Sequence, residues 1–159
     1  MLNFVDYGPQ NSRGCRALKV WLALQHVGRS GALQMIADDM ALSRQLHQMV
    51  AQHPPFEALT QSLSITTFRY VPIDLRERIG TPDVEEYLNS LNQDLLTCVE
   101  QSGDAFLSKA VIAGKLALRA CIVNFRTTRE DLEAVTELCG RLGAVADEAR
   151  LDRAKGPRK

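Results

Sequence analysis

The double proline Pro54-Pro55 divides the chain into two kinds of hydrophobic pattern, and this division most constrains the fold. Proline lacks a backbone N–H and clashes with the preceding turn, so a helix cannot continue through both positions. Before the prolines, apolar residues recur at the three- and four-residue spacing of helices. After them, apolar and polar residues begin to alternate as they do in strands. The chain must therefore combine helices with a sheet.

Local signals place the elements on either side of the prolines. A helix over about residues 13–27 ends at Gly28, because glycine suits the left-handed conformation at a helix C-terminus. A second helix covers about residues 31–52. Beyond the prolines, strands are predicted at about residues 56–59, 63–71, 105–112 and 115–123. Ala113-Gly114 between the last two strands favours a hairpin.

Two more helices have recognisable beginnings. Thr81-Pro82-Asp83 combines an N-cap residue, a proline in the first turn and an acidic residue near the helix N-terminus. Thr128 with Asp131 resembles a capping box, and a helix follows it. The predicted fold class is α+β, with a small antiparallel sheet of about four strands covered by helices.

Composition limits the classes of function. The 159 residues fit one domain, and 19 basic residues balance 19 acidic ones, which gives no support for a nucleic-acid or membrane partner. No apolar run approaches the ~20 residues of a membrane span. The cysteines at 15, 98, 121 and 139 lack metal-ligand spacing, and free thiols in apolar contexts predict a reduced, cytoplasmic protein.

Familiar catalytic and binding motifs are missing from the sequence. There is no nucleotide-binding glycine motif, no nucleophile elbow and no zinc-protease motif. His26, His47 and His53 have no carboxylate or cysteine at ligand spacing, so no metal site is predicted. The lysines, at positions 19, 109, 115, 155 and 159, are expected to be structural or solvated.

Arg119 is the candidate site residue. It lies in the middle of the apolar run 116–123, where a guanidinium either has a buried partner or faces a site. From the residues alone, two interpretations stay open. One is an ion pair with an acidic residue of a neighbouring helix, and the other is recognition of a carboxylate, which arginine can bind with two parallel hydrogen bonds.

The order of several short motifs resembles the C-terminal part of the group II pyridoxal-phosphate decarboxylases. The motifs are A-L-K-x-W at 17–21, G-x-L-Q-x-I at 31–36, P-x-F-E at 54–57, T-x-F-R at 66–69 and L-R at 118–119. The resemblance runs from about Asp6 to Asp147. It implies the small domain of a fold-type I pyridoxal-phosphate enzyme, preceded by a helix that connects it to a large domain.

The resemblance also implies roles for single residues. Arg119 matches the arginine that binds the substrate α-carboxylate in the glutamate-decarboxylase branch and would hold the scissile carboxylate out of the cofactor plane. Ser12, just before the first helix, would contact the cofactor phosphate, although Ser12, Gly14 and Cys15 depart from the family's glycine, arginine and phenylalanine. The family's Schiff-base lysine follows a histidine. No His-Lys pair occurs here, so Lys19 is not that lysine and no catalytic residue is assigned.

Three readings follow from the resemblance. The chain is the C-terminal portion of a pyridoxal-phosphate-dependent L-amino acid decarboxylase, inactive alone, or one subunit of a split enzyme, or a non-catalytic interaction and oligomerisation domain. Residues 1–30 would be the connecting loop and helix, 31–150 the small domain and 151–159 a disordered tail. The expected partner is a missing large domain or a second chain, and exposed apolar surface would favour a homo-oligomer such as a dimer. No covalently bound cofactor is expected on this chain.

Overall fold

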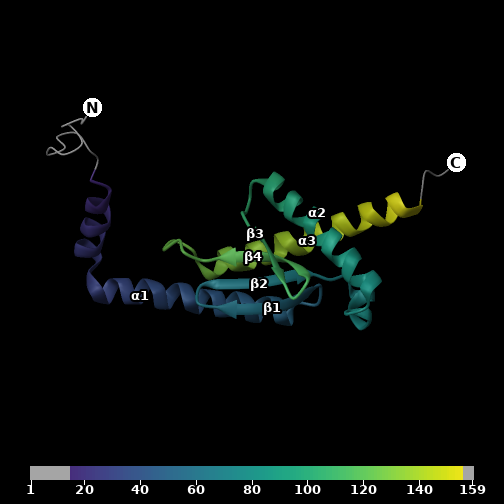
Figure 1. Ribbon diagram of the computed structural model, residues 1–159, viewed down its shortest axis with the longest axis horizontal. Helices are drawn as coiled ribbons and strands as arrows, with labels where there is room; N and C mark the ends of the chain where they lie inside the picture. The colour runs from purple at the N-terminus through teal and green to yellow at the C-terminus, as the bar shows by residue number, and fades with distance from the viewer. Residues whose placement is uncertain (1–14, 156–159) are drawn as a thin grey trace, which may run out of the picture. The chain divides into compact units, whose positions relative to one another are not determined.

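The computed structural model describes residues 15–155, with side chains through residue 153. The chain falls into two units, 1–35 and 36–159, a division slightly beyond the boundary near residue 30 expected from the sequence. The elements, coloured along the chain in Figure 1, are α1 (Arg16–Gln52), β1 (Phe56–Ser62), β2 (Ile65–Tyr70), a 3-10 helix (Ile73–Arg78), α2 (Pro82–Ser102), β3 (Ser108–Ile112), β4 (Lys115–Cys121) and α3 (Arg129–Lys155).

Helix α1 covers both of the helices predicted before the double proline. Gly28 interrupts it, with φ 68° and ψ 175°, so the predicted break lies where the glycine indicated. The helix ends just before the prolines, where the His53 N–H still donates to the Met49 carbonyl at 3.0 Å. Gly28 therefore determines the break in α1, and the two prolines determine its end.

The four strands form one antiparallel sheet in the order β1-β2-β4-β3, which confirms the predicted α+β class. Ala113 and Gly114 both have positive φ, 50° and 81°, and form the predicted hairpin turn between β3 and β4. β1 continues to Ser62, beyond its predicted end at residue 59. A register shift between Ala58 and Thr60 breaks the two-residue alternation there, which hid the second half of the strand.

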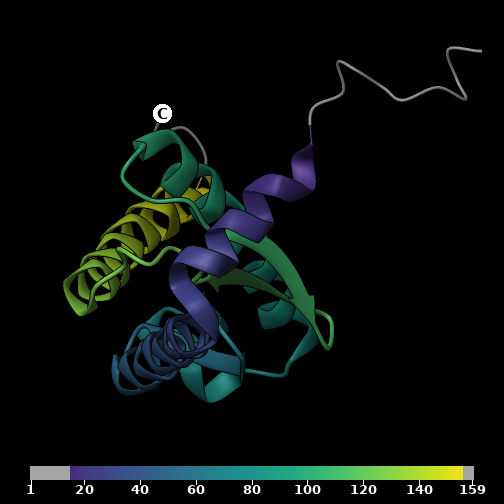
Figure 2. The ribbon, with the colours of Figure 1, turned by 90° about the vertical axis from the view of Figure 1, so that its left-hand side faces the viewer.

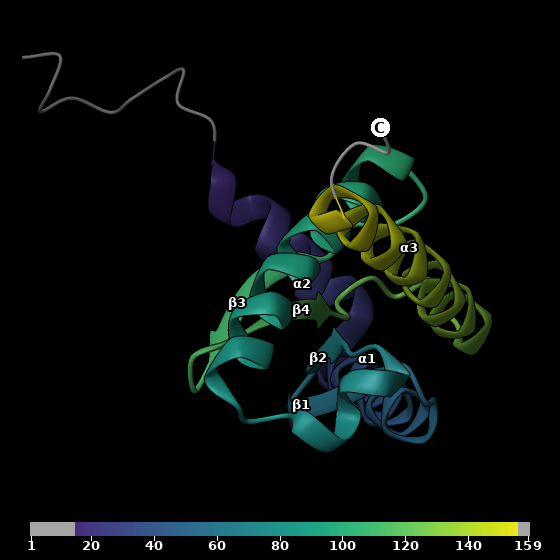
Figure 3. The ribbon, with the colours of Figure 1, turned by 90° about the vertical axis from the view of Figure 1, so that its right-hand side faces the viewer.

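One face of the sheet, here called the core face, carries the apolar side chains. Phe56, Phe68 and Leu118 lie on it and are almost fully buried. Leu46 and Val50 of α1 join the same cluster with residues of α2 and α3. The second half of α1 is seen end-on in Figure 2, and Figure 3 shows it on the same side of the sheet as α3. Within residues 36–155, the helices thus pack on the core face.

Helix α3 approaches this face closely at Gly143. A Cβ atom there would lie 2.4 Å from Cδ2 of Tyr70, so only glycine permits this contact. At the start of α3, the Thr128 N–H donates to Asp131 Oδ2 at 2.8 Å and the Asp131 N–H donates to Thr128 Oγ1 at 3.4 Å. This reciprocal pair is the predicted capping box. The helix continues to Lys155, so it includes the first residues of the predicted tail, and residues 156–159 lie outside the described residues.

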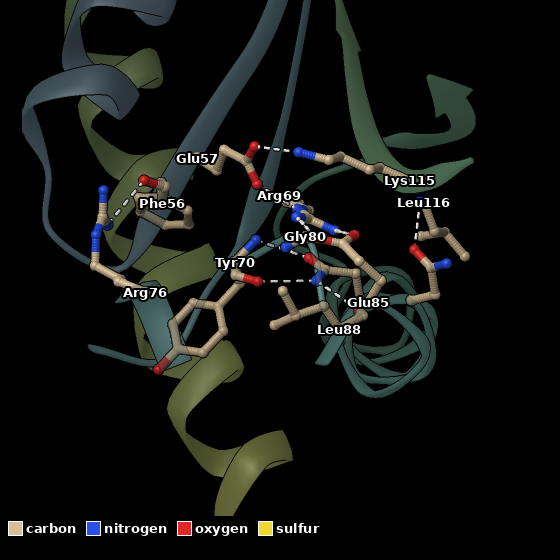
Figure 4. A network of polar contacts seen from close by, with 12 residues as sticks. Phe56, Glu57, Arg69, Tyr70, Arg76, Gly80, Glu85, Leu88, Lys115 and Leu116 are labelled. Atoms are coloured by element: carbon tan, nitrogen blue, oxygen red, sulfur yellow. Dashed lines mark hydrogen bonds and ion pairs between the residues drawn. The ribbon is translucent and has the colours of Figure 1, made fainter. Parts of the chain in front are cut away.

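Helix α2 fills a gap in the sheet. β2 and β4 pair only from Ile65 to Phe68, and beyond that point the side chain of Asn92 takes the place of a strand. Asn92 accepts from the Tyr70 N–H at 2.7 Å and donates to the Tyr70 carbonyl at 2.9 Å. Asn89 likewise accepts from the Leu116 N–H at 2.7 Å on β4. Figure 4 shows these dashed bonds at Tyr70 and Leu116.

The N-terminus of α2 differs from its prediction in one detail. Thr81 is the N-cap residue and Pro82 follows it, as the sequence indicated. The Thr81 hydroxyl, however, does not cap a backbone N–H of the helix and donates instead to the Arg78 carbonyl at 2.9 Å. Thr81 therefore also stabilises the turn before the helix.

Candidate functional site

The face of the sheet opposite the core face is here called the polar face. Side chains alternate between the two faces along each strand, so Glu57, Thr60, Thr67 and Arg69 lie on it from β1 and β2. Lys115 and Arg119 of β4 and Ser108 of β3 lie on it by the same alternation. Polar and charged groups of all four strands are thus gathered on a single surface.

One cross-strand row on the polar face contains the predicted site residue. Thr60 pairs with Thr67, Thr67 pairs with Arg119 and Arg119 pairs with Ser108, so the row crosses all four strands. Three of its members carry hydroxyl groups and the fourth is an arginine. Neighbours in such a row are close enough for their side chains to bond directly.

Arg119 is exposed, and its guanidinium is held on one side only. Its Nε–H donates to Ser108 Oγ at 2.9 Å. Across residues 15–153 no carboxylate forms an ion pair with Arg119, and no bond from its terminal nitrogens appears there. The structural ion pair, one of the two interpretations left open by the sequence, is therefore absent from this part of the chain. The terminal nitrogens remain available for an oxyanion.

A second arginine on the polar face has the opposite surroundings. Arg69 is fully buried, its Nε donates to Glu57 Oε2 at 2.6 Å, and its two terminal nitrogens bind the Glu85 carboxylate at 2.6 and 2.9 Å. Lys115 completes this charge cluster through a 2.6 Å contact with Glu57 (Figure 4). Sequence reasoning noted Arg69 only as part of a motif, because no local pattern reveals that α2 brings Glu85 to it.

Two members of the charge cluster, Arg69 and Glu85, have shifted pKa values. Burial alone would lower the pKa of Arg69, but the hydrogen bonds that it donates to Glu85 and Glu57, together with the charges of the two carboxylates, outweigh burial, so the pKa is raised. The hydrogen bond from Arg69 holds the pKa of Glu85 below its usual value. Both groups are charged at neutral pH, and every nitrogen of the Arg69 guanidinium is used. Arg69 is a structural residue and not a free binding group.

A large groove of residues 36–153 lies elsewhere, between the end of β4 and the start of α3. Its volume is about 780 Å³, and Leu46, Ile122 and Leu138 are among the apolar residues that line it. Arg126 and Arg141 contribute positive charge, while Asp104, Asp131 and Glu137 contribute negative charge. The lining residues include no lysine and no excess of positive charge that would select a phosphate group.

Pyridoxal phosphate is held in its enzymes as a lysine Schiff base, so the surroundings of the lysines bear on where the cofactor could be held. The Lys109 amino group donates to Gln93 at 2.8 Å, and that of Lys115 is engaged by Glu57. Lys19 is exposed in the unit 1–35. Ser12, the predicted phosphate contact, lies outside the described residues. Of the two predicted site residues, Ser12 and Arg119, only Arg119 is among the described residues.

The described residues contain neither a metal-binding cluster nor a membrane-spanning helix. No cluster of three or more histidine, cysteine or acidic side chains in residues 15–153 could hold a metal ion. None of the helices in this part of the chain is both long and apolar enough to cross a membrane. The described cysteines, at 15, 98, 121 and 139, are free thiols, and only Cys139 is buried.

Sequence comparison identifies homologous enzymes. The chain is 30% identical over 151 residues to aromatic-L-amino-acid decarboxylase of Bacillus atrophaeus, covering 94% of this chain and 29% of that protein. It is 31% identical over 123 residues to tyrosine decarboxylase 2 of Arabidopsis thaliana, covering 77% of this chain and 21% of that protein. No protein-family profile matches the chain.

Solved structures show the same fold. The chain matches mouse CSAD in its apo form with a TM-score of 0.76 at 22% identity, covering 89% of this chain and 30% of that one. It matches the glutamate decarboxylase domain of a Vibrio parahaemolyticus enzyme with a TM-score of 0.67 at 29% identity, covering 80% and 26%. The chain is therefore a homologue of the group II pyridoxal-phosphate-dependent amino acid decarboxylases and spans less than a third of the length of these relatives.

Proposed function

We propose that this chain is the C-terminal portion of a pyridoxal-phosphate-dependent L-amino acid decarboxylase, in which Arg119 binds the carboxylate of the substrate. The observation that carries the proposal is the guanidinium of Arg119, exposed on the polar face with both terminal nitrogens free of bonds from the described residues. An arginine in this state can form two parallel hydrogen bonds to a carboxylate. The homology to decarboxylases supplies the class of substrate.

The cofactor and its lysine would come from another part of the enzyme, because the chain contains no His-Lys pair of the kind expected for the Schiff-base lysine and spans less than a third of its relatives. We therefore expect the 159-residue chain alone to be inactive and to bind no cofactor covalently. Borohydride reduction in the presence of pyridoxal phosphate, followed by mass spectrometry, tests this. The unmodified mass is expected, and stoichiometric labelling of one lysine would overturn the proposal.

The role of Arg119 is tested by complementation. The chain is co-expressed with a polypeptide that supplies the cofactor-binding part of a homologous decarboxylase, and release of amine is measured. Arg119→Met is expected to lower kcat/KM about 10- to 100-fold, because hydrogen bonds to a charged group are lost. Arg129→Met is the matched control, since Arg129 is also exposed and forms an ion pair with Glu133 of its own helix. Full activity of Arg119→Met would overturn the proposed role.

A second candidate function, an interaction and oligomerisation domain, is favoured by the first part of α1. Large apolar side chains are exposed there, including Trp21 at 57%, Leu22 at 52% and Leu33 at 58%. Exposed apolar side chains in this number promote association between molecules. Trp21 is the single tryptophan of the chain, so its fluorescence reports directly on this segment. Sedimentation as a dimer with a blue-shifted tryptophan emission is expected, and a monomer at 100 µM, roughly the upper end of usual assay conditions, would contradict it.

The proposal also includes a partner for the chain, a cellular location and the origin of substrate selectivity. The large cofactor-binding part, or a second chain that supplies it, is the proposed partner. A cytoplasmic location is proposed on the basis of the free thiols. Which amino acid is decarboxylated would be decided largely by residues outside this chain, since the polar face offers a carboxylate ligand and Arg119 does not line the groove beside β4 and α3.

A further inference from the structure

Arg119 owes its orientation to a neighbouring hydroxyl group. Ser108 on β3 is its directly paired residue, and Ser108 Oγ accepts the Arg119 Nε–H at 2.9 Å. The same hydroxyl donates its single hydrogen to the Arg119 carbonyl at 3.3 Å. Ser108 is thus fixed by a donor and an acceptor that belong to the same residue, and its lone pair is aimed at the side chain of that residue.

The other hydroxyl beside Arg119 in the row does not share this role. Thr67 Oγ1 accepts the Thr60 N–H at 3.0 Å and lies 2.7 Å from Thr60 Oγ1. Its bonds are all directed toward β1, away from β4. Of the two hydroxyl groups that flank Arg119, only Ser108 therefore contacts the guanidinium, although both occupy equivalent positions in the row.

We infer that Ser108 is a positioning residue, which fixes the guanidinium of Arg119 with its two terminal nitrogens turned outward to receive a carboxylate; this inference rests on the proposed function of Arg119. An exposed arginine samples many rotamers, and ordering it on binding reduces affinity. Ser108 accepts the Nε–H of Arg119, and a carboxylate that binds to the two terminal nitrogens does not need this donor. The bond to Ser108 therefore orders the Arg119 side chain before the carboxylate binds and leaves both terminal nitrogens free for it.

Carboxylate binding should therefore depend on the Ser108 hydroxyl, although this hydroxyl does not contact the carboxylate. Removing the Ser108 hydroxyl leaves Arg119 in place with its charge and all its donors. The loss of one hydrogen bond is expected to weaken carboxylate binding about three- to tenfold. Because β3 pairs with β4 through its backbone from Ser108 to Ile112, the strand itself does not depend on this hydroxyl.

The test uses the full chain labelled with ¹⁵N and follows the Arg119 Nε–H signal by NMR, assigned by its disappearance in Arg119→Lys. In Ser108→Ala, the Nε–H is expected to exchange with solvent at least several-fold faster than in the wild type, and titration with 3-phenylpropanoate to give about three- to tenfold weaker binding. Ser108→Thr, which keeps the hydroxyl, should restore both values. Thr60→Val is the matched control, because it removes a hydroxyl from the same row without touching Arg119.

Different outcomes separate the two proposals. If Ser108→Ala leaves the Nε–H exchange rate and the affinity unchanged, or if Thr60→Val lowers the affinity as much, the positioning role is wrong. If 3-phenylpropanoate binds equally well to Arg119→Met, the proposed function of Arg119 fails, whatever Ser108 does to the exchange rate. Faster exchange with no change in affinity would show that Ser108 holds Arg119 but does not prepare it for a ligand, and would overturn the inference.

Discussion

Arg69 and Arg119 lie on the same face of the sheet, on adjacent strands, and their surroundings are opposite. Arg69 is buried and gives three hydrogen bonds to two carboxylates. Arg119 is exposed and gives one bond, to a neutral hydroxyl. The difference shows that an arginine in an apolar strand is not by itself a sign of a binding site. What matters is whether the fold has already supplied carboxylates for its donors.

The largest expected effect concerns Arg69. In Arg69→Met, Glu85 loses both of its bonds from the guanidinium, and Glu57 keeps only Lys115. Breaking a buried ion pair by removing one partner costs about 3 kcal/mol or more. The free energy of unfolding in urea measures this loss. A decrease below about 1 kcal/mol would mean that Arg69, like Arg119, contributes little to the fold.

A somewhat smaller effect is expected where α2 replaces a strand. Asn92→Leu leaves the N–H and the carbonyl of Tyr70 buried without their partner, which should cost about 2 kcal/mol in urea unfolding. Asn89→Leu is the control, since Asn89 is only partly buried and its loss should cost less. Equal losses for the two variants would show that burial of the backbone groups is not the deciding factor.

The charge around Arg69 also predicts a dependence on pH. Because the folded pKa of Glu85 is lowered by Arg69, its contribution to stability is fully present above its unfolded pKa and is lost as the pH falls through the lowered folded value. Glu85→Gln should therefore be less stable than the wild type at pH 7. That difference should shrink on acidification from the usual glutamate range near pH 4.5 downward. Urea midpoints that stay equally separated down to pH 2, roughly two units lower, would contradict this.

The smallest effect on stability is expected at Arg119. Because its side chain is exposed and makes a single neutral hydrogen bond, Arg119→Met should change the free energy of unfolding by less than about 0.5 kcal/mol. Together with loss of carboxylate binding, this result would separate a binding arginine from a structural one. A large destabilisation would instead place Arg119 in the same class as Arg69.

Local signals in the sequence were sufficient for most of the fold. Pro54-Pro55, Gly28 and Ala113-Gly114 placed the helix end, the helix break and the hairpin, because each restricts its own backbone. Local signals do not predict features that depend on contacts with other parts of the chain. The register shift after Ala58 concealed half of β1, and the extension of α3 to Lys155 had no marker in the sequence.

The sequence draws attention to Arg119 but does not give the geometry around it. Arg119 was singled out because a charge in an apolar run needs an explanation. Strand pairing places Ser108 beside Arg119, and the position of α2 brings Glu85 to Arg69. Neither arrangement can be derived from the spacing of residues along the chain. The same pairing explains why two arginines with similar sequence surroundings differ in accessibility.

The hydrogen bonds that join Asn89 and Asn92 to the backbones of β4 and β2 also affect how the protein unfolds locally. The amide protons of Tyr70 and Leu116 are held by side chains of α2 and not by a neighbouring strand. They can exchange with solvent only when α2 leaves the sheet. The sheet and α2 should therefore open as one cooperative unit, and these two amides, although they sit on different strands, should show the same slow hydrogen exchange as the buried turns of that helix.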